Sequence, residues 1–245
     1  LNTSNGDWNV AVGYSAAVSN TTGSYNTAIG TNALQTNTTA SNNTAVGYQA
    51  GYSNTTGSAN TFVGDSSGFT TSTGLYNAAF GRRSMYANTT GSYNTALGAQ
   101  DAGNAGALSA NTTGSYNTAV GNGSLASNTT ASNNVAVGYD AAYSNTTGQR
   151  LLALGNYALY ANTTGSYNVA MGDGALGANT TASNNTAVGY QAGYSNTTGE
   201  NNVALGRAAL ISNTTASVNT ALGDSSLRSN TTGASNTARS EEHTS

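Results

Sequence analysis

Apolar and polar positions along the chain follow one short pattern that recurs over almost its whole length. The tripeptide Asn-Thr-Thr marks each repeat, with degenerate copies at Thr3 and Thr71, and successive markers lie 17 residues apart except for one step of 23. Self-similarity at a fixed period is typical of repeat architectures. The spacing predicts fourteen repeats, the last one truncated, in a single array over residues 1–238, with a six-residue loop insertion within 99–106.

The repeat unit reads N-T-T-G-S-Y-N-T-A-V-G-Y-Q-A-L-Y-S, and its positions are numbered here from the Asn of Asn-Thr-Thr as place 1. Place 7 is Asn except at Leu151, and place 9 is Ala except at Phe62. Place 10 is apolar in every copy before Arg239. Place 11 is Gly in all thirteen copies that reach it before the final segment, and place 14 is always Ala or Ser. We interpret these constant places as requirements of stacking one repeat on the next.

A repeat this short is incompatible with helical hairpin repeats, which need about 30 residues or more. The segment N-T-A-V-G is β-compatible and bounded by Gly, and places 16 to 3 form a second stretch rich in Tyr, Ser and Thr. Two short strands and two corners per repeat predict an all-β fold, a parallel β-solenoid (β-roll) of about fourteen 17-residue coils. Gly at place 11 is expected to adopt a positive φ or to allow a close backbone approach. Asn at place 7 is expected to form an amide ladder.

Adjacent strand residues face opposite sides, so Ala at place 9 and the apolar residue at place 10 cannot both point inward. With Ala or Ser also at place 14, we expect a thin interior of small side chains and an outer apolar stripe at place 10. Such a stripe predicts self-association into a trimer or a fibre, with the chain itself as the partner. The opposite facing, with place 10 inside, stays open because periodicity does not fix absolute orientation.

Composition argues against an ordinary globule. Leu, Ile, Val and Phe supply only 32 of 245 residues, and charged residues make up 6% with a net charge of −3. Neither a large apolar core nor the charge repulsion of typical disordered chains is present. A regular backbone ladder is the remaining way to organise a chain of this composition.

Missing residue types narrow the possible chemistry. The chain has no Cys and no Lys, and its six Arg are scattered, which excludes disulfides, thiolate zinc sites, Schiff bases and a polybasic nucleic-acid surface. Asp65, Asp173 and Asp224 share place 12 but lie many coils apart, so they form no catalytic pair. The sequence therefore predicts no enzyme, no catalytic residue, no metal site and no cofactor. Arg82 and Arg83 form either an anion site or a solvated face.

No apolar run approaches the length of a membrane span, so no membrane contact is expected within these residues. Residues 239–245 break the repeat and resemble the translation of a sequencing adapter. We expect this segment to be non-native, on a fragment of environmental or shotgun (metagenomic) origin. The only histidine of the chain lies in that segment.

Asn-Thr-Thr matches the N-glycosylation pattern N-x-[ST], which also occurs at Asn2, Asn42, Asn122 and Asn184. Duplication copies whatever the unit contains, so a structural row of Asn and Thr is the alternative. We expect this row to be the outward, glycan-bearing edge, with covalent glycans as partners and the two degenerate copies bare. The candidate sites are Asn20, Asn37, Asn54, Asn88, Asn111, Asn128, Asn145, Asn162, Asn179, Asn196, Asn213 and Asn230.

The cores at Asn43–Gly47, Asn134–Gly138 and Asn185–Gly189 resemble the head repeats of YadA-like trimeric autotransporter adhesins, and similar units occur in phage tail fibres. The resemblance implies a parallel β-roll inside a trimer and an adhesive or structural role. The unit here differs from the usual one, because the N-T-T-G-S stretch makes it longer.

Three functions follow as hypotheses. The first is a glycosylated, self-associating structural component of an extracellular fibre, located outside the cell, at the cell surface or on a virion. The second is an adhesin or tail-fibre head that binds a receptor. The third is an ice-binding solenoid, suggested by Asn-x-Thr arrays on a flat face. Tyr at places 6, 12 and 16 is expected either to stack on sugar rings or to pack between coils.

Overall fold

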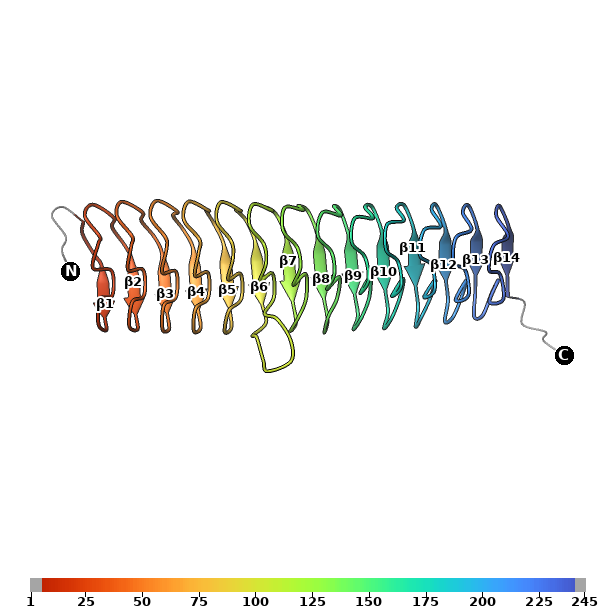
Figure 1. The fold of residues 1–245 in the computed structure, drawn as a ribbon, viewed down its shortest axis with the longest axis horizontal. Helices are drawn as coiled ribbons and strands as arrows, with labels where there is room; N and C mark the ends of the chain where they lie inside the picture. The colour runs from red at the N-terminus through yellow and green to blue at the C-terminus, as the bar shows by residue number, and fades with distance from the viewer. Residues whose placement is uncertain (1–5, 241–245) are drawn as a thin grey trace. The chain divides into compact units, whose positions relative to one another are not determined.

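A computed structural model of the chain describes residues 6–240. These residues form an all-β parallel β-solenoid with one three-residue strand at the same place in every coil (Figure 1). The fold class predicted from the repeat is confirmed. Over the described range there is no helix, and hence no helical segment with the length and hydrophobicity needed to cross a bilayer. Residues 241–245 of the predicted non-native tail lie outside the described range, whereas Arg239 ends the last strand.

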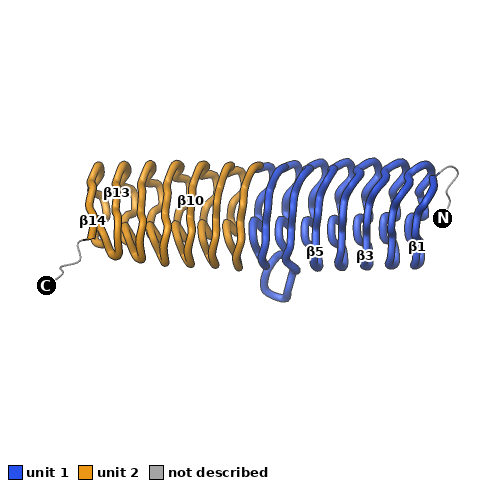
Figure 2. Tube along the Cα trace, turned by 180° about the vertical axis from the view of Figure 1, so that it is seen from behind, with its two compact units in different colours: residues 1–131 blue, residues 132–245 orange. Residues whose placement is uncertain are grey.

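The chain divides into two compact units, coloured separately in Figure 2, with the division after Ala131. The strands of unit 1 are β1 (Val10–Val12), β2 (Thr27–Ile29), β3 (Thr44–Val46), β4 (Thr61–Val63), β5 (Ala78–Phe80), β6 (Thr95–Leu97) and β7 (Thr118–Val120). The strands of unit 2 are β8 (Val135–Val137), β9 (Leu152–Leu154), β10 (Val169–Met171), β11 (Thr186–Val188), β12 (Val203–Leu205), β13 (Thr220–Leu222) and β14 (Thr237–Arg239). Each strand covers places 8 to 10 of its repeat.

Within each unit, consecutive strands pair in parallel and in one fixed register. Ala28 of β2 lies opposite Ala45 of β3, and Ala170 of β10 lies opposite Ala187 of β11. Every residue therefore faces the same place of the next coil. Identical side chains stack in rows at the inter-strand spacing of about 4.8 Å.

The second strand predicted for each coil does not form. Places 16 to 3 are turns and bends, although backbone bonds still join the coils there, as from Thr38 N to Thr55 O at 3.1 Å. Places 6, 13 and 15 have positive φ, as at Tyr25 (60°), Asn32 (59°) and Leu34 (48°). Left-handed residues interrupt an extended backbone, so each coil keeps one strand and closes through tight corners.

The interior contains mainly small side chains, as predicted. Ala28 at place 9 is fully buried, whereas Leu97 at place 10 is 50% exposed. The prediction that Ala faces inward and place 10 outward is confirmed, and the opposite facing is excluded. Place 15, which the repeat pattern did not indicate as interior, is also part of the core: Leu34 and Leu108 are completely buried beside the Ala or Ser of place 14. One Leu in many coils thus completes a thin apolar core.

The constant Gly of place 11 meets the expected requirements: its φ is positive in every coil except that of Gly98, which has only the close backbone approach. Gly47 has a φ of 138°, and a Cβ added there would lie 2.5 Å from the carbonyl oxygen of Gly64 in the next coil. Any side chain would force adjacent coils apart. The coil spacing therefore depends on Gly at this place.

Candidate interaction surfaces

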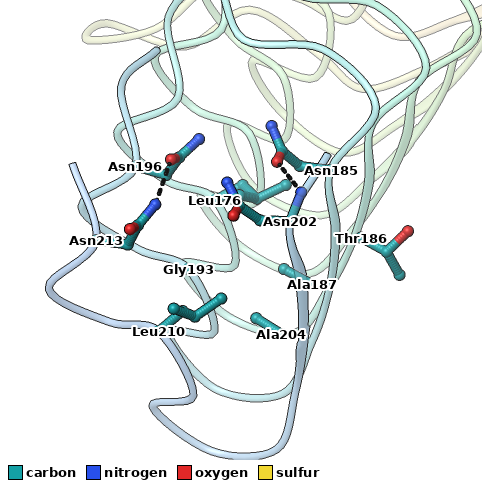
Figure 3. Close-up of a pocket in the computed structure, with 10 residues that line it drawn as sticks. All are labelled: Leu176, Asn185, Thr186, Ala187, Gly193, Asn196, Asn202, Ala204, Leu210 and Asn213. Atoms are coloured by element: carbon teal, nitrogen blue, oxygen red, sulfur yellow. Dashed lines mark hydrogen bonds between the residues drawn. The ribbon is translucent and has the colours of Figure 1, made fainter. Parts of the chain in front are cut away.

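The asparagines of place 1 form a ladder inside the solenoid. Asn37 Nδ2 donates to Asn20 Oδ1 at 2.8 Å and to the Ala40 carbonyl at 3.1 Å. In unit 2, Asn213 Nδ2 donates to Asn196 Oδ1 at 3.0 Å, and both side chains point inward in Figure 3. In these pairs Nδ2 uses both protons to join its own corner to the preceding coil. Within residues 6–240, Asn88, which follows Thr71 in the row, donates to the Gly91 carbonyl alone.

This geometry corrects the expectation that the Asn of the Asn-Thr-Thr row faces outward, whereas the Thr of place 3, as at Thr39, is exposed. Eleven of the twelve candidate glycosylation sites are at most 2% exposed: Asn20, Asn37, Asn54, Asn88, Asn111, Asn128, Asn145, Asn162, Asn179, Asn196 and Asn213. The twelfth, Asn230 of the last coil, is half-buried. A glycan would replace one proton of a buried Nδ2 that donates two bonds, so this geometry argues against attachment. Glycosylation itself stays an untested prediction, and the degenerate copy at residues 3–5 lies outside the described range.

The asparagines of place 7 are also buried, but they bond mainly to backbone. Asn43 N donates to Asn26 Oδ1 at 3.0 Å, and Asn26 Nδ2 donates to the Ala40 carbonyl at 2.8 Å. A direct contact between two amides occurs at Asn94 Nδ2 and Asn77 Oδ1, 3.2 Å apart. The amide ladder predicted for place 7 therefore forms regularly at place 1 instead, whereas most bonds of the place-7 side chains go to backbone groups. Together the two rows satisfy backbone groups at the corners of the coil.

Places 8 and 10 of the strands form the surface that we call the outer sheet face. Place 8 holds Thr, Val, Ala or Leu, and Thr186 points away from the interior in Figure 3. Place 10 holds Val, Leu, Ile, Met or Phe in every coil before Arg239. The more exposed of its apolar side chains, between 36% and 58% accessible, are Val12, Ile29, Phe80, Leu97, Val137, Met171, Leu205 and Leu222. Each unit therefore presents a continuous, partly apolar row.

Aromatic side chains stack along two further rows of unit 1. At place 6 the ring centroids of Tyr93 and Tyr116 are 5.0 Å apart. At place 16, Tyr52, Phe69 and Tyr86 stack at 5.1 Å per step. Rings at this separation gain from contact with one another. The prediction that these rings pack between coils is confirmed here, while stacking on sugars stays untested.

The acidic residues singled out in the sequence remain dispersed. Asp224 accepts a bond from Arg207 Nε at 2.7 Å, and this bond to an exposed guanidinium is the main reason why the pKa of Asp224 lies below its ordinary value. Asp65 Oδ1 accepts a bond from Ser66 Oγ at 2.6 Å. Residues 6–240 hold no cluster of three or more His, Cys, Asp or Glu side chains that could ligate a metal ion.

The predicted insertion is a loop that leaves the solenoid after β6 (Figure 1). Asp101 Oδ1 accepts bonds from Gly103 N at 2.9 Å and Asn104 N at 2.8 Å. Asp101 Oδ2 accepts a bond from Asn122 Nδ2 at 2.7 Å. The Gly103 amide contributes most to a pKa of Asp101 below its ordinary value. One carboxylate thus holds the loop closed and ties it to the following coil.

A groove of about 310 Å³ lies at the base of this loop. We call it the Arg83 groove, and it is lined by Arg83, Tyr86, Ala87, Gln100, Ser109 and Ala110. Arg82 and Arg83 were predicted to form an anion site or a solvated face, whereas the other lining residues were not predicted. The available signal was that the insertion directly follows the coil with the two arginines.

A second space lies inside unit 2 and is shown in Figure 3. It measures about 10 Å³ and lies between Leu176 and Leu210, where Gly193 occupies place 15 without a side chain. A space of that size admits at most a single water molecule. It is a packing defect of the core rather than a ligand site.

No protein-family model, no curated protein and no solved structure matches this chain. The repeating parallel β-solenoid with turns of 17 residues is what the structure shows. The resemblance to adhesin heads and tail fibres therefore stays a hypothesis based on the short N-T-A-V-G core.

Proposed function

We propose that the chain is a structural component of a fibre and that it associates with further copies of itself through the outer sheet face. The observation that carries this proposal is the row of half-exposed apolar side chains at place 10, as at Leu97 and Leu222. Contiguous apolar rows of this kind are unusual on the surface of soluble monomers.

The energetics favour association only when many coils engage together. Complete burial of a Val or Leu side chain stabilises by about 1.5–3 kcal/mol, so covering the exposed half adds about 1 kcal/mol per coil. The loss of translational and rotational freedom opposes association by about 4–15 kcal/mol. One or two coils are insufficient, whereas a row of seven or more approaches a favourable balance. Length is therefore the property that makes this weak surface effective.

A second copy of the chain is the partner that fits this row best. The side chains of place 10 recur once per coil, and each strand pairs with the next in the same register. A partner with a different rise per repeat would lose register after a few coils. An identical solenoid keeps it along the entire row, and the two flat faces interdigitate as stacked sheets do.

Trimeric assembly and an extracellular or virion location belong to the same proposal and rest on the resemblance to adhesin and tail-fibre repeats. Receptor binding by such a head is the second hypothesis from the sequence and has the same support. The ice-binding hypothesis rested on Asn and Thr side by side at the surface. That array does not form, because Asn37 and its counterparts are buried.

Analytical ultracentrifugation of charged variants tests the proposal. We choose Val46→Lys with Val63→Lys, two neighbouring positions of place 10. The matched control carries Thr39→Lys with Thr56→Lys, at exposed place 3 of the same two coils. We expect the wild-type chain and the control to sediment as oligomers, and the place-10 variant to shift toward monomer because each buried ammonium must lose its hydration.

Circular dichroism checks that both variants keep the β fold. A wild-type chain that is monomeric at all concentrations would overturn the proposal. Equal dissociation of the place-10 variant and the place-3 control would also overturn it, because the interface would then lie elsewhere.

A further inference from the structure

The Arg83 groove lies where the regular repeat is broken. The aromatic row Tyr52, Phe69 and Tyr86 ends at Ser109, because a small residue occupies place 16 of the coil that carries the insertion. The same coil leaves the solenoid after Gln100 to form the loop. The end of this aromatic row and the added loop therefore coincide at the groove.

Arg83 is held in this groove by two contacts. Its guanidinium carbon lies 4.9 Å from the ring centroid of Tyr86, and its Nη1 donates to Gln100 Oε1 at 3.3 Å. Both partners are neutral, and within residues 6–240 no carboxylate forms an ion pair with Arg83. The side chain is exposed, and a guanidinium carries five donors, so most of its donors remain available to a ligand.

The remaining lining has the character of a sugar site. Ala87 and Ala110 offer two methyl groups, which suit the C–H face of a pyranose. Tyr86 offers the edge of its ring, because Phe69 stacks on the ring and the Arg83 guanidinium lies over it. Gln100 uses its Oε1 for Arg83, which leaves Nε2 as a donor. Ser109 Oγ donates to the Ala126 carbonyl at 3.3 Å and can still accept a bond. The volume of about 310 Å³ lies at the lower end of small-molecule sites.

We propose that the Arg83 groove binds a saccharide that carries a carboxylate, such as a uronic acid. The carboxylate forms a charge-assisted pair with the planar guanidinium of Arg83, whose fork matches two carboxylate oxygens. The sugar ring lies against Ala110 and the edge of Tyr86, and its hydroxyls bond to Gln100 and Ser109. This binding site is independent of the fibre-forming role of the outer sheet face.

The test is saturation-transfer NMR and titration calorimetry of the full chain with D-glucuronic acid, D-glucose and D-glucose 6-phosphate. We expect glucuronic acid to bind and glucose to bind far more weakly. Arg83→Gln should weaken glucuronic acid binding by about tenfold to a hundredfold, the loss expected when a hydrogen bond to a charged group is removed.

Two matched controls distinguish the loss of the Arg83 contact from the mere loss of one positive charge. Arg82→Gln removes an equal charge from the neighbouring exposed residue and should leave binding unchanged. Arg150→Gln removes an arginine that lies 5.2 Å over the ring of Tyr167 in a regular coil of unit 2, and it should also leave binding unchanged. Ser109→Tyr introduces at place 16 the tyrosine that other coils hold there, as at Tyr52 and Tyr86. This ring should fill the groove and abolish binding.

Circular dichroism and the melting temperature of each variant report whether the fold is retained. Equal affinity for glucose and glucuronic acid would overturn the carboxylate assignment, and so would tighter binding of glucose 6-phosphate. Undiminished binding by Arg83→Gln or by folded Ser109→Tyr would overturn the assignment to this groove, as would the absence of binding by any of the three sugars.

Discussion

The buried side-chain oxygens of Asn54 and Thr71, which occupy the same place in successive coils, both lack a hydrogen-bond partner. Thr71 replaces the asparagine of place 1, so no Nδ2 reaches Asn54 Oδ1 as Asn37 Nδ2 reaches Asn20 Oδ1 at 2.8 Å. A buried polar atom without a partner costs about 1–3 kcal/mol. The asparagine ladder of unit 1 is thus interrupted at one coil.

Replacing Thr71 by the asparagine of the repeat should stabilise the protein. The new Nδ2 would donate to Asn54 Oδ1 and to the Gly74 carbonyl, and each bond adds about 0.5–1.5 kcal/mol. Urea unfolding of Thr71→Asn should show a higher midpoint than wild type. Thr73→Asn, the same substitution at an exposed place of the same coil, should leave the midpoint unchanged. A Thr71→Asn variant no more stable than this control would contradict the ladder.

Phe62 fills space that two glycines leave open. A Cβ added to Gly51 would lie 2.8 Å from Phe62 Cδ2, and one added to Gly68 would collide with the same ring. Many other coils hold Ala at place 9 and Leu at place 15. The φ of Leu34 at place 15 is 48°, which is close to the 61° of Gly68. Phe62→Ala should destabilise by about 3–5 kcal/mol, and Gly68→Leu should destabilise through overpacking. The double variant should recover most of the loss in a double-mutant cycle, whereas additive losses would refute this packing.

The inserted loop should open in acid. Hydrogen bonds to the Asp101 carboxylate lower its pKa in the folded loop below the ordinary value. The carboxylate therefore stabilises the loop fully above the ordinary pKa, and this contribution is lost as the pH falls through the lowered pKa. NMR should show the amide signals of Gly103 and Asn104 shifting over that acidic window. In Asp101→Asn the shifts should be absent, and persistence of the same shifts there would assign them to another group.

N-glycan occupancy offers a check on which sequons reach the surface. Asn42 and Asn184 at place 6 are exposed, and both are followed by Asn and Thr in the glycosylation pattern. Expression in a glycosylating secretory host should give occupancy at these two residues and leave Asn111 and Asn179 bare in folded material. Glycopeptide mass spectrometry measures this directly. Occupied Asn111 or Asn179 in folded protein would contradict the buried ladder.

Much of the fold follows from the repeat itself. Alternation within the strand placed Ala28 inside and Ile29 outside, because three extended residues obey the two-residue period. The same rule failed at Ala33 and Leu34, which are adjacent and both buried. The positive φ of Leu34 turns its side chain back toward the core, and no hydrophobic pattern encodes that reversal.

The interaction surfaces were less predictable. Asn37 matches a glycosylation pattern, and its spacing alone fits an outward corner as well as an inward one. Its direction is decided by the bonds that Nδ2 makes to Asn20 and Ala40, which depend on the stacked coil. The Arg83 groove depends on Gln100 and Ser109 from the inserted coil, and their position follows from the path of the loop.

The central claim, association through the outer sheet face, is tested most directly by thiol labelling, because the chain contains no Cys. Single cysteines at Leu97 or Leu205, both at place 10, would report the outer sheet face. Cysteines at the exposed place-3 residues Thr90 and Thr198 would serve as controls. As the protein concentration rises, maleimide labelling should slow at Leu97→Cys and Leu205→Cys and stay constant at Thr90→Cys and Thr198→Cys. Labelling rates at place 10 that do not change with concentration would contradict the account.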